Sequence, residues 1–433
     1  MCSGIIIFKV CDGVLINLIQ IVKSERKITQ LTLVSIVLTI GFSFDPTMEF
    51  DKIASVYDEV CLSSRKFSTI LHKTLTSETK ENVINSPFGL HIILSLLSYG
   101  AKNETADALK SRLYHPKTNL ENGFKGLKSL FSEVKDVDLN VANTIYVQDD
   151  LHLNHEFVTL SAEIFGAGVI QVDFKQPLNA VKQINSWIVE KTKNKIKDVL
   201  TIGDINDETR LFMINAVYFK SSWKNKFDLK LTTQQDFYKE NNKVKQVYMM
   251  FKSAHFSHGV LEDLNAKFIE IPYQNEDFAM QIILPNEVDG LQSIEENFHW
   301  DQILNAHLRK SEVELYLPKF KLEMKITLQE TLKKMGLSKI FQDDADFHGI
   351  SSEDLKVSHV VQKIFIEVDE EGSEVAAATV AQVRRSRSIR NDIPEEFRVN
   401  RPFLFLILYK QGNIPLFLGS VRDLEAVIEK DEL

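Results

Sequence analysis

Hydrophobic and polar positions follow one pattern in the first half of the chain and another in the second. In the first half, apolar residues recur three and four positions apart, which is typical of amphipathic helices. We expect helices at residues 90–99, 121–134 and 180–193. A later helix is expected at 328–335 and should end at Gly336, because glycine commonly terminates helices.

Strand patterns concentrate in the second half. Two pairs of apolar runs are joined by short polar turns, which predicts two β-hairpins. Their runs cover residues 268–273 with 278–285, and 402–409 with 414–421. Further strands are predicted at 313–317 and at the β-branched run 360–368. Helices followed by strands in this way favour an α+β fold.

The composition is that of an ordinary globular protein, with 44% hydrophobic and 26% charged residues. After residue 50 the chain of 433 residues contains no flexible linker, low-complexity tract or repeat. We therefore predict one large domain over residues 44–433.

The N-terminus is different. An apolar run at 31–42 follows Lys23, Arg26 and Lys27, and small residues near Ser43 suit signal cleavage. The run is too short to cross a bilayer, so residues 1–43 are predicted to be a secretory signal region, with no membrane span in the mature chain. Residues 4–22 are also apolar, and they fit either a signal-anchor fragment or an upstream extension.

Loss of residues 1–43 changes both charge and cysteine content. That segment carries four basic and two acidic side chains, so the net charge of −9 becomes −11. Such a balance disfavours nucleic acid as a partner. Cys2 and Cys11 leave with the signal, and Cys61 remains as a structural thiol with no partner for an intrachain disulfide.

The last four residues form an address for return to the endoplasmic reticulum. They are Lys430, Asp431, Glu432 and Leu433. Together with the signal, they predict a protein of the endoplasmic reticulum lumen and secretory pathway that binds the retrieval receptor. A fraction that escapes retrieval would be secreted.

Motifs for catalysis are missing from the sequence. We find no phosphate-binding glycine loop, no HExxH and no G-x-S-x-G, so we expect neither enzymatic activity nor a cofactor. The pairs His152/His155 and His255/His258 could hold a metal on a helix, but no third ligand accompanies them. We interpret them as surface histidines and expect no metal. The sequon that begins at Asn103 predicts a glycosylation site there.

A segment near the C-terminus combines a strand-forming arm with a bait for proteases. The arm begins with two acidic residues and a glycine, and its members are Glu370, Glu371, Gly372, Ser373, Glu374, Val375, Ala376, Ala377, Ala378 and Thr379. From Ser373 to Arg387 there is neither proline nor glycine, so the whole stretch can form a strand. Alternation places Ser373 and Thr379 on one face and Glu374 on the other.

This arrangement resembles the reactive-centre loop of serpins. Six further motifs occur in the order typical of that family. They are 85–87, 100–106, 215–223 with Phe227, 317–320, 345–350 and 400–405. The resemblance covers nearly all of the chain beyond residue 50. It implies a serpin fold, with a large central sheet, further sheets, surrounding helices and an exposed loop at 370–395.

The resemblance also implies a mechanism. A serine protease would cleave the loop as a substrate, and the arm would insert into the sheet while the protease is still acylated. The chain would be a monomeric suicide inhibitor, not an enzyme. Val375 departs from the alanine commonest at its position, and its bulk could slow insertion. Ser86, Asn215 and Gln362 fall where the family places a polar shutter beneath the sheet.

Arginines in the bait suggest the target. Arg384 and Arg387 form Arg-x-x-Arg, which resembles the recognition sequence of furin-like proprotein convertases. We therefore predict the reactive bond Arg387–Ser388. Ordinary family spacing lands on Ser386, and cleavage at Arg385–Ser386 would instead favour a trypsin-like target.

A further alternative is a non-inhibitory chaperone serpin of the endoplasmic reticulum. The alanine-rich arm argues against that function, because a chaperone needs no insertable strand.

Overall fold

The computed structural model describes residues 46–116, 120–240, 243–373 and 394–425. The predicted signal region, most of the arm, the bait and the retrieval tail lie outside this range.

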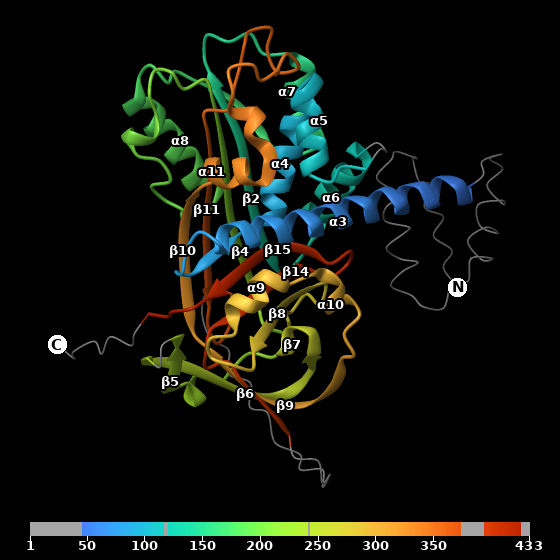
Figure 1. Cartoon of the computed structure of the whole chain (residues 1–433), viewed down its shortest axis with the longest axis vertical. Coiled ribbons are helices and arrows are strands. Elements are labelled where there is room, and N and C mark those ends of the chain that lie inside the picture. Colours follow the sequence, from blue (N-terminus) through green and yellow to red (C-terminus); the bar gives the residue numbers. More distant parts are fainter. Residues whose placement is uncertain (1–45, 117–119, 241–242, 374–393, 426–433) are drawn as a thin grey trace, which may run out of the picture.

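Within the described residues the strands form two sheets (Figure 1). The six-stranded sheet has the order β10-β11-β12-β4-β2-β3. These strands are β10 (Phe320–Thr327), β11 (His359–Val368), β12 (Gly372–Ser373), β4 (Leu211–Ser222), β2 (Val137–Gln148) and β3 (Gly168–Val172). Pairing is mixed, because β11 and β4 run parallel while β10 and β11 run antiparallel.

The nine-stranded sheet has the order β1-β15-β14-β8-β7-β6-β9-β13, with β5 paired to β6. Its strands are β1 (Val83–Asn85), β15 (Ile414–Val421), β14 (Phe403–Tyr409), β8 (Phe278–Pro285), β7 (Ala266–Pro272), β6 (Lys243–Leu261), β9 (Arg309–Pro318), β13 (Glu395–Arg398) and β5 (Thr233–Lys239). The hairpins β7–β8 and β14–β15 confirm the predicted pairs, and the predicted α+β class is confirmed.

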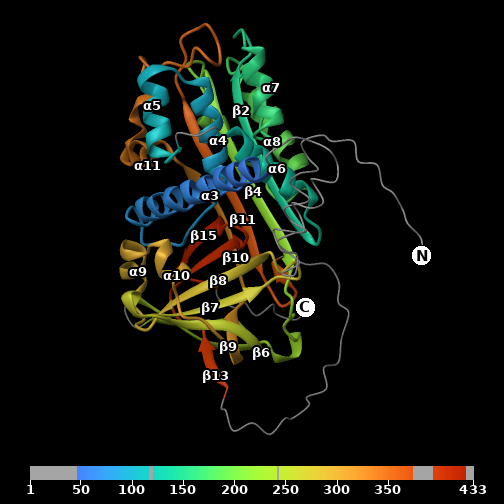
Figure 2. The same ribbon diagram turned by 90° about the vertical axis from the view of Figure 1, so that its right-hand side faces the viewer.

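Helices cover both faces of the six-stranded sheet (Figures 1 and 2). Apolar residues of α8 pack with one face of β2, β4 and β11, and those of α4 pack with the other. The helices are α3 (Pro46–Thr76), α4 (Pro87–Gly100), α5 (Asn103–Arg112), α6 (Glu121–Glu133), α7 (His155–Glu163), α8 (Pro177–Lys191), α9 (Leu291–Asn297), α10 (Trp300–Leu304) and α11 (Gln329–Leu332). The central sheet is therefore buried between two layers.

Predicted helix bounds agree with α4, α6 and α8 to within a few residues. The helix predicted at 328–335 is shorter than expected in its α-helical part. It ends at Leu332 and continues as a wider turn, Lys333–Leu337, in which Gly336 has φ of +86°. A side chain at Gly336 would be strained in this conformation and would contact Arg112.

Cys61 lies in α3 and is buried, as its interpretation as a structural thiol requires. It packs beside Gly412, where a side chain would collide with the Cys61 sulfur. In the part of the chain that the structure describes, no helix is both long and apolar enough to cross a bilayer.

Candidate functional site: the loop hinge and the sheet opening

The first residues of the arm form a tight turn at the end of β11. The Asp369 carboxylate accepts hydrogen bonds from the backbone N–H groups of Glu371 (3.0 Å) and Gly372 (3.2 Å). The Asp369 N–H donates to the carbonyl of Gly372 at 2.9 Å. Burial raises the pKa of Asp369, although these two N–H groups oppose the shift. The turn reverses the chain so that it runs back along β11.

The reversed chain then enters the six-stranded sheet. Gly372 pairs with Ser222 of β4, and Ser373 pairs with Ser221 of β4 and with Val368 of β11. Only glycine fits at position 372, since a side chain there would collide with the Ser221 carbonyl. Thus β12 is a short strand already seated between β11 and β4.

Ser373 faces the interior at this point. It is fully buried, and its hydroxyl lies 2.8 Å from the hydroxyl of Tyr273. Tyr273 stacks on Trp223, with ring centroids 4.7 Å apart. The motif 215–223 therefore packs, through Trp223 and Tyr273, beneath the first residues of the arm, which we call the hinge.

Backbone hydrogen bonds fasten the turn to the segment after β4. The Trp223 and Phe227 N–H groups donate to the carbonyls of Glu371 and Glu370, both at 2.8 Å. The Trp223 indole N–H donates to the Asp369 carbonyl at 2.9 Å.

The two acidic residues of the hinge are held differently. Glu370 is buried and accepts from Lys319 Nζ (2.8 Å) and from the Thr232 hydroxyl (2.9 Å). Burial works to raise the pKa of Glu370, but the hydrogen bonds that its carboxylate accepts from Lys319, from a backbone N–H and from Thr232 outweigh burial, and the pKa lies below its ordinary value. Glu371 is more exposed and forms an ion pair with Lys226. Glu370 is therefore the stronger anchor of the hinge.

Beyond β12 the sheet is closed. There β11 and β4 pair directly, from His359 opposite Phe212 to Phe365 opposite Tyr218. The two strands thus form a fork that is open at the end occupied by β12 and shut along the rest of its length. Any further insertion of the arm has to separate these pairs.

The predicted shutter residues meet in the closed part of the fork. Gln362 and Asn215 are direct cross-strand partners, and Gln362 Nε2 donates to Asn215 Oδ1 at 2.6 Å. The Gln362 amide also donates to the Ser86 carbonyl (2.9 Å) and accepts from the Ser86 N–H (3.1 Å). All three residues are buried. The structure thus brings them together, and their role in sheet opening stays a prediction.

A fourth residue of this network was missed from the sequence. Asn143 of β2 accepts from Asn215 Nδ2 at 2.7 Å and donates to the Gly89 carbonyl at 3.1 Å. The signal in the sequence was an asparagine inside the largely apolar run 141–147, but the strand that contains it, β2, was itself not predicted. The network therefore extends from β11 across β4 to β2.

Asn103 lies at the start of α5 with its side chain exposed. Its amide donates to Asp346 at 2.8 Å, and a glycosylated amide keeps one N–H for that bond. Thr105, the third residue of this sequon, is fully buried. A glycosylating enzyme could therefore contact the Thr105 hydroxyl only before the chain folds.

The interpretation of His258 as a surface residue is wrong. His255 and His258 lie on strand β6, where residues three apart point to opposite faces. His255 is exposed, whereas His258 is buried. His258 Nε2 lies 2.7 Å from the Ser311 hydroxyl, and Nδ1 lies 3.7 Å from the Glu395 carboxylate. Among the described residues, no group of three or more candidate ligands could hold a metal ion.

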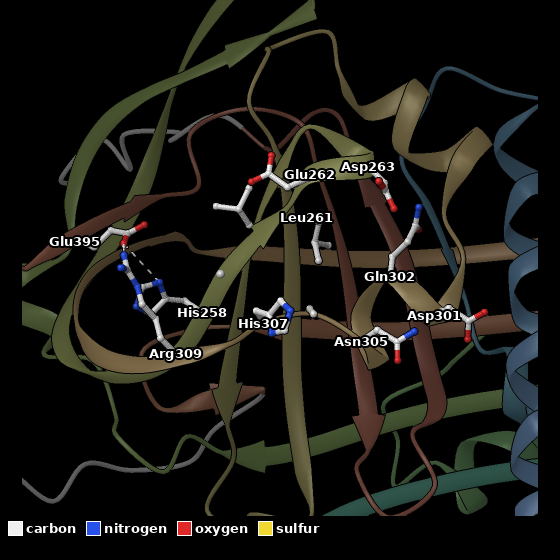
Figure 3. A pocket seen from close by; sticks show the side chains of 13 residues that line it. His258, Leu261, Glu262, Asp263, Asp301, Gln302, Asn305, His307, Arg309 and Glu395 are labelled. Carbon is white, nitrogen blue, oxygen red and sulfur yellow. Dashed lines mark hydrogen bonds and ion pairs between the residues drawn. The ribbon is translucent and has the colours of Figure 1, made fainter.

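His258 borders a cavity of about 670 Å³ at the root of β13 (Figure 3). Arg309 also pairs with Glu395, the first residue of β13. Burial lowers the pKa of His258, and the charges of Arg309 and Lys267 add to this effect while Glu395 opposes it. Arg309 thus holds the residue at which the loop returns to the body, and the His258 ring lies beside this ion pair.

Comparison with known proteins identifies the family. Residues 62–424 match the model described as "Serpin (serine protease inhibitor)". Human Serpin B4 is 34% identical over 381 residues, which cover 82% of this chain and 97% of that protein. The antitrypsin of Bombyx mori is 33% identical over 332 residues, which cover 76% of this chain and 85% of that protein. A solved structure of Serpin48 from Tenebrio molitor superposes with a TM-score of 0.77 at 33% identity, covering 85% of this chain and 98% of that one. The chain therefore belongs to the serpin family of serine protease inhibitors.

Proposed function

We propose that this serpin is a suicide inhibitor of furin-like proprotein convertases in the secretory pathway, cleaved at Arg387–Ser388. The family supports inhibition of serine proteases. The arginines support the convertase target, because Arg384 and Arg387 suit a protease with two acidic subsites.

The seated strand β12 is the observation that carries the proposal. Its register fixes where every later residue of the arm would pair during insertion. Ser373 lies opposite Ser221 and Val368, so Thr379, six residues on, would arrive between Asn215 and Gln362. These two amides are hydrogen-bonded to each other in the closed sheet, and insertion would move their strands from about 4.8 Å to about 9.6 Å apart. The Thr379 hydroxyl would replace the lost partner.

The alternation of side chains along the arm also supports insertion between β11 and β4. Val375, Ala377 and Thr379 would share the face of Ser373 and enter the core, while Glu374 would stay on the opposite face. Ser373 and Ala377 add little bulk at these core-facing positions, whereas the β-branched Val375 and Thr379 suit a strand but fill more space.

Insertion also releases enough free energy to trap a protease. The direct β11–β4 pairs are replaced by pairs on both sides of the new strand. At roughly 0.5 to 1.5 kcal/mol per added backbone hydrogen bond, a strand of about a dozen residues gains on the order of 10 kcal/mol. This is comparable with the stability of a whole domain.

The location rests on the sequence. The signal region and the retrieval tail support residence in the endoplasmic reticulum lumen, in a compartment connected with that of the convertases. Glycosylation at Asn103 belongs to the same proposal.

A mixing experiment tests the function. Purified protein incubated with a furin-like convertase should give a covalent complex that survives SDS, and sequencing should place the cut after Arg387. A cut after Arg385, with faster trapping of trypsin, would support the trypsin-like alternative. Clean turnover without a complex by either protease would refute inhibition.

A further inference from the structure

The cavity that His258 borders is enclosed by separate parts of the chain. One wall is the end of β6 with the turn that follows it, and a second wall is α10 with the loop that leads to β9. Figure 3 shows Arg309, Glu395 and His258 close together at one end of the cavity. Its volume of about 670 Å³ lies in the range of pockets that bind small molecules.

Buried apolar side chains hold the two walls in place. Leu261 and Leu264 from the first wall belong to one hydrophobic cluster with Trp300 of α10. Gly259 lets the loop before β9 lie against β6, because a side chain at position 259 would collide with the His307 carbonyl. The cavity is therefore formed before a ligand binds, and binding would cost little free energy for ordering the site.

The charge of the lining is unbalanced. Four carboxylates and one guanidinium line the cavity, so these groups together carry a formal charge of −3. Arg309 pairs with Glu395, which neutralises that end. Glu262, Asp263 and Asp301 are exposed, and within the described residues they have no ion pair and no side-chain hydrogen bond. We call these three residues the acidic end.

An organic ammonium group suits the acidic end. Carboxylates bind ammonium groups through charge-assisted hydrogen bonds, which are stronger than hydrogen bonds between neutral groups. A metal ion is a poorer candidate, since no group of three or more ligand residues in the described part of the chain is placed to hold one.

The opposite end contains a buried nitrogen without a hydrogen bond. His258 is 1% exposed, and its Nε2 lies 2.7 Å from the Ser311 hydroxyl. Its Nδ1 has a Glu395 oxygen at 3.7 Å, which is too far for a hydrogen bond. An unpaired buried polar atom raises the free energy of the empty site. A ligand hydroxyl would remove this cost, because it can donate or accept and so fits either tautomer of the ring.

Apolar residues separate the two ends. Val260, Leu261 and Ala306 line the cavity, and Figure 3 shows Leu261 between His258 and Asp263. Val260 is 48% exposed. From His258 to Leu261 the strand advances about 10 Å. A ligand that reaches both ends therefore needs an extended apolar body between its two polar groups.

We propose that this cavity binds a small amine that carries a hydroxyl at the far end of an apolar body. The ammonium group pairs with the acidic end, the apolar body lies against Leu261 and its neighbours, and the hydroxyl bonds His258 Nδ1. This site is independent of the proposed inhibitory function, because its occupancy is measured without a protease.

Calorimetric titration of the purified protein tests the proposal with three matched six-carbon probes. We expect 6-aminohexan-1-ol to bind most tightly. Hexylammonium, which lacks the hydroxyl, should bind about threefold or more weakly, the loss expected for one hydrogen bond. The anion 6-hydroxyhexanoate should not bind. Equal binding of the amine and the anion, or no binding of 6-aminohexan-1-ol, would overturn the proposal, and equal binding of the two amines would overturn the contact with His258.

A double variant locates the site. Asp263→Asn/Asp301→Asn should lower the affinity for 6-aminohexan-1-ol about tenfold or more, because it removes two charged acceptors. Asp107→Asn/Glu208→Gln is the matched control, since it changes the net charge equally at two exposed residues outside the cavity. The control should bind as the wild type does. Equal melting temperatures without ligand will exclude misfolding, and equal losses in both double variants would show general attraction of cations and overturn the site.

Discussion

A charge at position 373 should convert the inhibitor into a substrate. Ser373 is fully buried between β11 and β4, so Ser373→Arg cannot be seated there without burying a guanidinium that has no partner. The native fold should survive, because the short strand β12 can leave the sheet.

The magnitude follows from the cost of a buried charge. Burying an unpaired ion costs several kcal/mol, and about 4 kcal/mol at the first inserted position would slow insertion about a thousandfold. The rate of acyl-enzyme hydrolysis would be unchanged. Hydrolysis would therefore be faster than insertion, and the protease would be released. Ser373→Ala is the control. It leaves the buried Tyr273 hydroxyl without this partner, which costs about 1 to 3 kcal/mol, but it introduces no charge and should still insert.

The assay titrates each variant against a fixed amount of convertase and separates the products on SDS gels. We expect wild type and Ser373→Ala to give covalent complex, and Ser373→Arg to give only cleaved protein at a similar rate of loop cleavage. A covalent complex of Ser373→Arg at wild-type stoichiometry would refute the reasoning.

Three further predictions concern specificity, acid stability and glycosylation. Arg384→Ala should weaken inhibition of a convertase far more than inhibition of trypsin, because only the convertase has a second acidic subsite; equal losses in measured association rates would contradict this. Burial lowers the pKa of His72 to about 3, of His91 to about 4 and of His115 to about 3. Below pH 6.5 the unfolded chain therefore binds protons that the native chain does not, and each histidine should cost about 2 kcal/mol by pH 5, visible as a lower melting temperature than at pH 7. Asn103→Gln should remove the mass that peptide-N-glycosidase releases from the wild type, and an unchanged digest would show that the site is not used.

Local patterns in the sequence predicted much of the sheet. The two hairpins and β11 are long apolar runs with clear turns, so they were found close to their observed bounds. Strand β2 was missed because its second half is buried on both faces and therefore lacks alternation. Helix α3 was also missed, although its buried residues Val60, Phe67 and Leu71 follow helical spacing.

Contacts between distant segments could not be predicted from these patterns. Glu370 is 51 residues from Lys319 and 138 residues from Thr232, and only the folded chain shows that both hold its carboxylate. The burial of His258 was missed for a related reason. The three-residue spacing of His255 and His258 was interpreted as helical, which would place both side chains on one face. The segment is strand β6, in which the two side chains point to opposite faces.

A crystal structure of the loop-cleaved protein tests the central claim most directly. The account predicts the arm as a new strand between β11 and β4, with Thr379 between Asn215 and Gln362. A cleaved protein in which Gln362 still bonds Asn215 and the arm lies in solvent would contradict it.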